Sequence, residues 1–400
     1  MTEHKTPLKV LLLSPNKPAP TGSGGIIAAY GHGASVAQAG YQVEFAVPFP
    51  KGNAADIGYP VHFLEEEAPS QQAQIKWFGE LLKTVKPDFV WLFHFNHWDL
   101  FAPYRQFYPH AILLGDPEWQ TQLIRAQFRH PQRSLGRKFL DYLALLQTVR
   151  CFKAEEKRVI TEAHQYGVVA SFSVYDTPGM SQRSGVPAIH NCPLAFPDWG
   201  ERAEATSQGK PQALMLGNLN GAQTRTGLRF FFTEVWPHWV NHVDPPRSIV
   251  RIVGKGKLPD YFPHPQDHEK LEWIGFVPSL EDEWNQATAV LVPVPIEQGI
   301  RTRIVEAWSK AAPVIAHPSA EAAIPEMKAG VNYLAAIAAE EWIAALRRLE
   351  SDPAFARTIA QNGRRTYEQF YAVEPGAARF GKLMQLAFER FQAKHREAGK

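Results

Sequence analysis

The chain has 400 residues, of which 45% are hydrophobic and 20% charged, and a formal net charge of +2. This length exceeds one ordinary core and predicts two or three domains, while the near-neutral charge excludes a strongly basic nucleic-acid-binding protein. The only two cysteines, Cys151 and Cys192, are far apart and fit no metal spacing, so we expect a protein of the reducing cytoplasm without disulfides. Residues 1–7 are polar, unlike a signal peptide, and apolar runs reach only about six residues, against the roughly 20 of a membrane span.

The first half of the chain alternates short apolar runs with segments of helical period. Ile26–Ala39, closed by Gly40, lies between the first two runs and predicts a helix. The pattern is typical of parallel strands buried on both faces in a doubly wound sheet. The predicted strands are Leu8–Leu13, Gln42–Val47, Asp88–Phe93 and Ala111–Leu114.

A second series of strands follows the polar segment Asp198–Pro211, which has the composition of a linker. Helices are predicted over Arg229–Val240 and Arg301–Ala311. The domains predicted are an N-terminal Rossmann-like domain (1–200), a C-terminal Rossmann-like domain (201–375) and a terminal helix (376–400). The predicted strands are Gln212–Leu216, Ile249–Val253, Leu271–Ile274, Ala289–Val292 and Pro313–Ala316.

The terminal helix carries one apolar stripe. Its members share the spacing i, i+3, i+4, i+7 and i+11, and they are Phe380, Leu383, Met384, Ala387 and Phe391. We expect this stripe to pack back on the first domain, although a cap on the second domain alone is the simpler alternative.

A glycine-rich segment, Thr21–Gly25, lies between the first strand and the first helix. Glycine lets the backbone approach a ligand, and the helix N-terminus offers N–H groups to an anion, so Gly24 and Gly25 are candidate phosphate contacts. The segment does not match GxGxxG, and a plain turn fits it equally well.

A second motif, Gly299–Ala307, follows the predicted strand Ala289–Val292. We expect a helix to begin at Gly299 and to present N–H groups to a diphosphate, with Arg301 and Arg303 pairing with phosphate oxygens. Glu306, about two turns further, could accept hydrogen bonds from a ribose diol. An amphipathic helix with exposed charges is the structural alternative, but the order glycine, basic, basic, acidic favours a binding site.

The loop Leu216–Leu219 is the first of the second series, and Arg225 lies downstream of it. Open α/β sheets bind ligands beyond the carboxyl ends of their strands. Gly217 and Asn218 are therefore candidate ligand contacts, and Arg225 is either a phosphate ligand or a solvated loop arginine.

The segment His94–Trp98 follows another predicted strand. One of His94 and His97 could bond a sugar hydroxyl or a leaving oxygen, or either could be a satisfied structural histidine. Asp116 and Glu118 come after the next strand, but no spacing in this cluster supports a zinc site.

The segment Trp119–Leu140 contains no acidic residue. The basic stretch Arg125–Lys138 predicts either a solvated basic face or a surface for an anionic acceptor or lipid, hence a peripheral contact with the inner membrane face. Its arginines recur every four residues, at Arg125, Arg129, Arg133 and Arg137, with Lys138 after them and Pro131 between.

Together these motifs resemble the retaining GT-B glycosyltransferases of the group 1 or GT4 family. Pro293–Ala316 resembles the donor-binding segment of that family, while Gly24-Gly25 and Ile189–Asn191 resemble its N-terminal glycine loop and its Pro-Asn-Gly segment. Shorter segments match in order, namely Ala213–Gly217, Phe230–Pro237, Val253-Gly254 and Gly275–Val277. The resemblance implies an α/β GT-B fold, with two Rossmann-like domains whose parallel sheets face each other across a cleft.

The resemblance also implies a role for each position. Glu306 would bind the donor ribose, Arg225 and Arg303 would balance the diphosphate, and a histidine at His94 or His97 would lie near the donor sugar. These four basic residues are the catalytic candidates. The implied donor contacts are Gly24, Gly25, Gly217, Asn218, Arg225, Gln298, Gly299, Ile300, Arg301, Thr302, Arg303 and Glu306.

The implied reaction moves a sugar from a UDP- or GDP-linked donor to a glycan, lipid-linked or other small acceptor. Retention follows from the resemblance, and no metal or other cofactor is required if arginines stabilise the leaving diphosphate. Gln298 replaces a glutamate that many members carry eight positions before the ribose glutamate, which keeps open a degenerate GT-B protein that binds without catalysis. A nucleotide-sugar epimerase would need proton-transfer carboxylates, for which Asp116 and Glu118 are the candidates.

Overall fold

A computed structural model describes residues 7–22, 24–52, 56–128, 135–202, 211–257 and 268–398. The chain divides into two compact units. The first unit comprises Met1–Leu123, His130–Pro197 and Phe370–Lys400, and the second comprises Ile124–Arg129 and Asp198–Gln369. None of the described helices is both long enough and apolar enough to cross a bilayer.

The first unit contains a seven-stranded parallel sheet in the order β3-β2-β1-β4-β5-β6-β7 within the described residues. The central strand β1 lies between β2 and β4, so that Leu11 is paired with Glu44 on one side and Val90 on the other. The strands are β1 (Lys9–Leu13), β2 (Gln42–Val47), β3 (Val61–Phe63), β4 (Phe89–Phe93), β5 (His110–Leu114), β6 (Val168–Ser171) and β7 (Ile189–Asn191). Continuous apolar burial along β1, β4 and β5 is what helices on both faces of a parallel sheet require.

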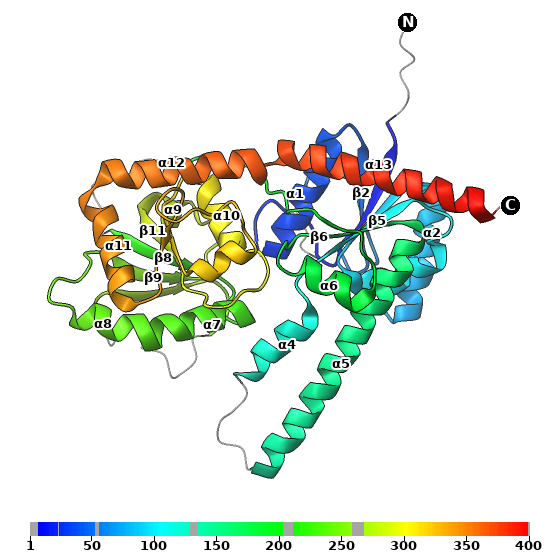
Figure 1. The fold of residues 1–400 in the computed structure, drawn as a ribbon. Coiled ribbons are helices and arrows are strands. Elements are labelled where there is room, and N and C mark those ends of the chain that lie inside the picture. The colour runs from blue at the N-terminus through cyan, green and yellow to red at the C-terminus, as the bar shows by residue number, and fades with distance from the viewer. Residues whose placement is uncertain are drawn as a thin grey trace, which may run out of the picture. The chain divides into compact units, whose positions relative to one another are not determined.

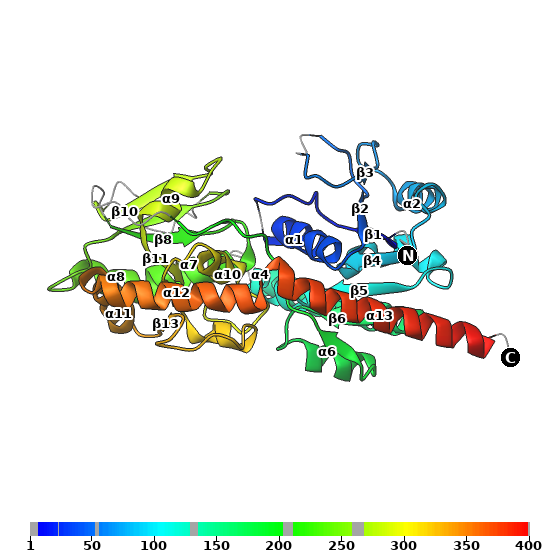
Figure 2. The same ribbon diagram turned by 90° about the horizontal axis from the view of Figure 1, so that it is seen from above.

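Helices cover both faces of this sheet, with α1 and α13 on one face (Figure 2). On the other face α2, α3, α5 and α6 bury apolar side chains against the strands. The helices are α1 (Gly24–Gln38), α2 (Gln71–Val85), α3 (Trp98–Phe101), α4 (Glu118–Ala126), α5 (Leu135–Tyr166), α6 (Thr177–Ser184) and α13 (Val373–Ala398), with α4 divided between the units.

The last helix, α13, packs on α1 (Figure 1). The Phe380 ring lies 3.9 Å from the His32 ring and 5.4 Å from Trp91, and Phe388 lies 5.3 Å from Phe89, measured between ring centroids. The hydroxyl of Ser35 donates to the Val373 carbonyl at 3.0 Å. The stripe from Phe380 onward therefore lies against residues of the first unit.

The second unit contains a six-stranded parallel sheet in the order β10-β9-β8-β11-β12-β13 within the described residues. Its strands are β8 (Gln212–Leu216), β9 (Ile249–Val253), β10 (Leu271–Gly275), β11 (Ala287–Val292), β12 (Val314–Ala316) and β13 (Leu334–Ala335). Its helices are α7 (Ala222–Phe230), α8 (Trp236–Asn241), α9 (Glu281–Gln286), α10 (Thr302–Ser309), α11 (Ala339–Ser351) and α12 (Pro353–Phe370), with a π-helical turn, Phe231–Val235, joining α7 to α8.

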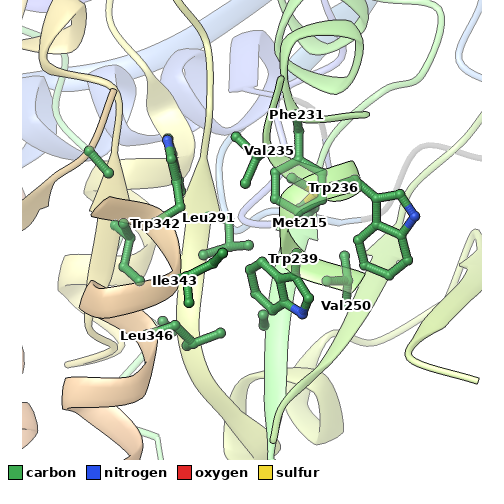
Figure 3. Close-up of a cluster of buried hydrophobic side chains, with 14 of the residues drawn as sticks. Met215, Phe231, Val235, Trp236, Trp239, Val250, Leu291, Trp342, Ile343 and Leu346 are labelled. Carbon is green, nitrogen blue, oxygen red and sulfur yellow. The ribbon is translucent and has the colours of Figure 1, made fainter. Parts of the chain in front are cut away.

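Aromatic side chains dominate the core on one face of this sheet (Figure 3). Trp239 of α8 and Trp342 of α11 are completely buried, beside Phe231 and the strand residues Met215 and Leu291. Burying such large rings stabilises a fold strongly, since each removes 150–250 Å² from water, about 4–6 kcal/mol at 25 cal/mol per Å². This aromatic core therefore fixes the strands whose carboxyl ends carry the loops described below.

All nine strands predicted from apolar runs are confirmed, three with the predicted bounds and six with one end shifted by one or two residues. Four more strands, β3, β6, β7 and β13, have only two to four residues and gave no clear apolar run. The predicted helix Arg229–Val240 was placed too late, because the helical segment begins at Ala222. The predicted linker Asp198–Pro211 lies largely outside the described residues.

A close contact between α1 and the segment after β7 gives a test of this packing. A Cβ added at Gly31 of α1 would lie 2.2 Å from the Ala195 carbonyl oxygen, whereas one at Gly136 of α5 would meet nothing within 4 Å. We predict that Gly31→Ala destabilises the first unit by roughly 1–3 kcal/mol through overpacking. Gly136→Ala should be neutral or stabilising by up to about 1 kcal/mol because alanine favours helix. Urea unfolding measures both, and equal stability of the two variants would contradict the packing.

Candidate functional site

Both sheets reverse their direction of winding between two central neighbours. In the first unit these are β1 and β4, and in the second they are β8 and β11. At such a switch point the connections leave in opposite directions, which opens a place for ligands beyond the strand ends. The predicted donor contacts and catalytic residues all lie in a loop or helix that directly follows one of these four strands.

The loop between β11 and α10 is a tight turn built around Gly299. Its backbone φ of 60° is left-handed, a conformation that favours glycine and cannot belong to a helix. The expectation that the helix begins at Gly299 is therefore wrong, because α10 begins at Thr302. Arg301 is buried and its guanidinium donates to the carbonyls of Ile296, Gln298 and Gly299, so that it holds the turn from inside.

The N-terminus of α10 has no side-chain cap. Thr302 is its first residue, and the amide N–H groups of a first turn have no partner within a helix. Arg303 forms an ion pair with Glu306, one turn later, whose side chain is nearly buried. The Ile304 amide donates to the Arg301 carbonyl at 2.9 Å, whereas the amides of Thr302 and Arg303 have no hydrogen-bond partner in the described residues. The helix thus offers two free N–H groups in the same turn as the Arg303–Glu306 ion pair.

A second helix holds the same loop. The Gln223 side chain on α7 donates to the Gln298 carbonyl at 3.2 Å, and a Cβ at Gly227 would lie 2.9 Å from the side chain of Val294. Gln298 itself and Ile300 are buried. The turn is therefore fixed between α7 and α10, which gives any ligand at α10 a preformed wall.

The loop after β8 is equally compact. A Cβ at Gly217 would lie 2.7 Å from the Thr224 hydroxyl, and one at Gly254 would lie 1.7 Å from the Gly217 carbonyl oxygen. Asn218 is exposed, and its side chain accepts from a backbone amide within its own turn. Arg225 donates through Nε to the Leu219 carbonyl at 2.9 Å, and its terminal nitrogens form no hydrogen bond or ion pair with the residues that the structure describes.

Sequence reasoning did not single out two side chains after β9 and β10. Phe276 is 62% exposed, and the Lys255 ammonium lies 4.6 Å from the centre of its ring. An exposed aromatic ring with a cation over it can stack a planar or sugar ring. Phe276 lies in the segment Gly275–Val277 that matched the family, but its side chain was given no role. Its exposure is what marks it as a candidate contact, and exposure cannot be read from the sequence.

In the first unit the glycine loop leads into α1, whose first residues are Gly24 and Gly25. Gly25 is exposed, and a Cβ there would lie 3.1 Å from the side-chain Nδ2 of Asn16. Asn16 is held in the preceding turn by the hydroxyl of Ser14, which donates to its carbonyl at 2.6 Å. The loop after β1 is therefore narrow and leaves the helix end accessible.

His94 directly follows β4 in a backbone conformation that is rare for any residue except glycine. Its φ is 83° and its ψ is 151°. Strain of this kind costs on the order of 1–3 kcal/mol and gathers at functional sites. The imidazole is half-buried, and only a glycine at position 115 leaves room for it, because a Cβ there would lie 2.7 Å from the ring. Burial lowers the pKa of His94 to about 4, so the ring is neutral near pH 7.

His97 lies one turn further and is buried. Its ring stands edge-on to Phe49, with 5.9 Å between the ring centroids, and its Nε2 has no hydrogen-bond partner in the described residues. Burial lowers its pKa to about 4 as well. The structure thus distinguishes the two histidines, since only His94 occupies the strand end.

The carboxylates considered for proton transfer lie one strand away from the switch point, after β5. Glu118 begins α4 and accepts a hydrogen bond from Gln122 at 2.7 Å. Asp116 precedes it in the connecting loop. Within the described residues, no group of three or more metal-ligating side chains is found.

Comparison with known proteins decides the fold. Residues 210–352 match the family model of the glycosyl transferases group 1. No curated protein matches the chain significantly by sequence. Among solved structures, the chain is similar to sucrose-phosphate synthase from Thermosynechococcus elongatus, with 15% identity, 96% and 99% of the two chains covered, and a TM-score of 0.69.

Two further structures are similar over almost their whole length. Anabaena HepE, solved in complex with UDP, has 14% identity, coverage of 94% and 100%, and a TM-score of 0.62. A glycosyltransferase from Rickettsia africae has 10% identity, coverage of 96% and 99%, and a TM-score of 0.63. The fold is GT-B. The matched residues 210–352 lie in the second unit of this GT-B chain, and the predicted fold class is confirmed.

The buried histidines of the GT-B chain's first unit predict sensitivity to acid. Burial lowers the pKa of His32 to about 3, and those of His94, His97 and His110 to about 4, from 6.5. The unfolded chain therefore binds more protons than the folded chain below pH 6.5. We predict a constant stability above about pH 6.5 and a decrease toward pH 4, by up to 1.4 kcal/mol per pH unit for each histidine.

Urea unfolding at about pH 7.5 and pH 5 measures this dependence. His32 offers the sharpest variant, because neither ring nitrogen has a hydrogen-bond partner in the part of the chain that the structure describes, and both Trp91 and Phe380 lie against the ring. His32→Leu should reduce the pH slope of the first unit by about one proton. An equal free energy of unfolding at the two pH values would contradict the prediction.

Proposed function

We propose that this protein transfers a sugar from a UDP- or GDP-linked donor to an acceptor. One observation carries the proposal: the uncapped N-terminus of α10 stands beside the Arg303–Glu306 pair at the switch point of the second sheet. This segment lies inside the region that matches the group 1 family model. UDP bound to the similar Anabaena HepE adds support for a nucleotide donor.

The donor nucleotide would bind through the second unit. Glu306 is proposed to accept hydrogen bonds from the ribose hydroxyls, with Arg303 holding its carboxylate in place. The N–H groups at Thr302 and Arg303 would face the diphosphate, since a helix N-terminus favours an anion. Gly299, Ile300 and Gln298 shape the wall, and Arg301 is proposed as a positioning residue because its guanidinium holds the turn.

The chemical problem is a diphosphate that gains charge as it leaves the sugar. Arg225 of α7 is the proposed partner of that charge, because its Nε is anchored to Leu219 in the loop after β8 and its terminal nitrogens have no partner in the described residues. Gly217 and Asn218 would let the backbone approach the phosphates. We propose that these groups replace a metal ion and that the sugar keeps its anomeric configuration, with the acceptor proton passing to a diphosphate oxygen.

The first unit would act on the sugar. His94 is proposed as the residue that touches the donor sugar, because it stands at the strand end in a strained conformation and is neutral near pH 7. A neutral imidazole can donate one hydrogen bond and accept another. Gly24 and Gly25 are proposed to give the phosphates access to the N-terminus of α1.

The acceptor is proposed to be a glycan, a lipid-linked sugar or another small molecule, used in glycan synthesis in the cytoplasm. The basic stretch Arg125–Lys138 is proposed as a peripheral membrane contact. Arg129 and Arg133 of this stretch lie outside the described residues, whereas Arg137 and Lys138 are exposed at the start of α5.

The donor site predicts selective stabilisation by one nucleotide. Among UDP, GDP and ADP, we expect one to raise the stability of the second unit by roughly 2.7 kcal/mol at 100 times its dissociation constant. Glu306→Ala should lose most of this effect because the ribose contact is gone. Thermal unfolding with each nucleotide measures the stabilisation.

The matched control is Glu340→Ala, since Glu340 is a largely exposed glutamate of the same unit. It should respond to nucleotide like the wild type. If no nucleotide stabilises the folded wild type, or if both variants respond alike, the donor site is wrongly placed. Nucleotide binding without any sugar transfer would instead support a GT-B protein that only binds.

The two histidines predict unequal effects on transfer. We expect His94→Ala to reduce kcat about 100-fold or more with little change in nucleotide affinity, because its role falls on the reacting sugar. His97→Ala should act mainly on stability, since that ring is buried against Phe49. Initial rates of nucleotide release in the presence of acceptor measure both, and a larger catalytic loss in His97→Ala would reverse the assignment.

A further inference from the structure

The first turns of α5 expose an unusual run of large apolar side chains. Phe139 is 61% exposed, Leu140 64%, Tyr142 55% and Leu143 44%. Isolated exposed apolar residues are normal, but a contiguous patch marks a surface that another molecule covers. We call residues 137–143 the α5 tip. In Figure 1 the N-terminal half of α5 extends beyond the sheet of the first unit.

The exposed residues continue a stripe that is buried further along the same helix. Phe139, Tyr142, Leu143 and Leu146 have the spacing i, i+3, i+4 and i+7, and Val149 follows on the same face. Val149 is buried, and Ile160, which falls on the same face, is fully buried in the core of the first unit. One end of this stripe is therefore anchored in the unit, while its other end is exposed.

The charges around the α5 tip are mainly positive. Arg137 and Lys138 are exposed beside Phe139, and Arg150 is exposed on the next turns. Asp141 is the only acidic residue of the tip. Exposed aromatic and leucine side chains flanked by arginine and lysine are the composition of helices that lie in the interface of anionic membranes.

We infer that the α5 tip docks on an anionic phospholipid surface. A second copy of the chain fits less well, because the tip has two cations, Arg137 and Lys138, and one carboxylate, Asp141, so that two tips offer each other few opposite charges. A lipid surface satisfies both features at once, as the apolar face enters the acyl boundary and the cations contact headgroup phosphates. The inference extends the peripheral membrane contact proposed above for Arg125–Lys138 and rests on that part of the proposed function. It does not depend on the proposed transfer reaction, because docking needs neither donor nor acceptor.

Vesicle flotation of the full chain tests the inference. The wild type should float with vesicles of phosphatidylcholine and phosphatidylglycerol, and bind at least tenfold more weakly to phosphatidylcholine alone. Phe139→Ala with Leu143→Ala should reduce binding to anionic vesicles by about tenfold or more. Arg137→Gln with Lys138→Gln should reduce it by roughly fivefold for each charge and remove its dependence on salt.

The matched control is Phe107→Ala, because Phe107 is 64% exposed in the same unit but lies outside the α5 tip. It should bind vesicles like the wild type. Thermal unfolding shows whether each variant is folded, and all five substitutions, the control included, lie at exposed positions.

Two results would overturn the inference. The first is a folded wild type that does not bind anionic vesicles, or binds them equally well with Phe139 and Leu143 replaced. The second is a wild-type dimer that Phe139→Ala with Leu143→Ala converts to a monomer in analytical ultracentrifugation without lipid, which would assign the tip to a second copy.

Discussion

The pairing of two central parallel strands in each unit is the constraint on which the candidate site depends. From β1 and β4, and from β8 and β11, the chain winds outward in opposite directions. The loops after these neighbours therefore separate, and the helices that follow them can present the N–H groups of their first turns to a ligand. The strand ends of the two units differ in chemistry, because different side chains follow β1 and β4 in the first unit and β8 and β11 in the second.

In the second unit, close packing fixes the conformation of the loops that follow β8, β9 and β11. Gly217 and Gly254 allow the loops after β8 and β9 to touch, and the turn at Gly299 is held from inside by Arg301. Arg301 is therefore not available to a ligand. Of the other two arginines, Arg303 is paired with Glu306, and the terminal nitrogens of Arg225 have no partner in the described residues. Preorganised donors of this kind stabilise developing charge because they need no rearrangement during the reaction.

The sequence carried most of the fold because buried parallel strands are continuous apolar runs. Leu8–Leu13 and Gln42–Val47 were found in this way, whereas Val61–Phe63, a short and partly exposed edge strand, has no such pattern. The start of α10 was misplaced because glycine fits both a helix start and a left-handed turn, and only the backbone angle of Gly299 separates them.

The candidate site was less predictable, since contacts between distant residues decide it. Nothing in the order of residues shows that Arg301 turns inward, that His94 is strained, or that Phe139 is exposed. Each follows from what surrounds the side chain. The sequence supplied the residue types at the strand ends, and the packing assigns them to different tasks.

A structure determined with bound nucleoside diphosphate would test the central claim most directly. The account predicts the diphosphate at the N-terminus of α10 and near Arg225, with the ribose hydroxyls on Glu306. A nucleotide bound elsewhere on the chain, or one whose ribose lies away from Glu306, would contradict it.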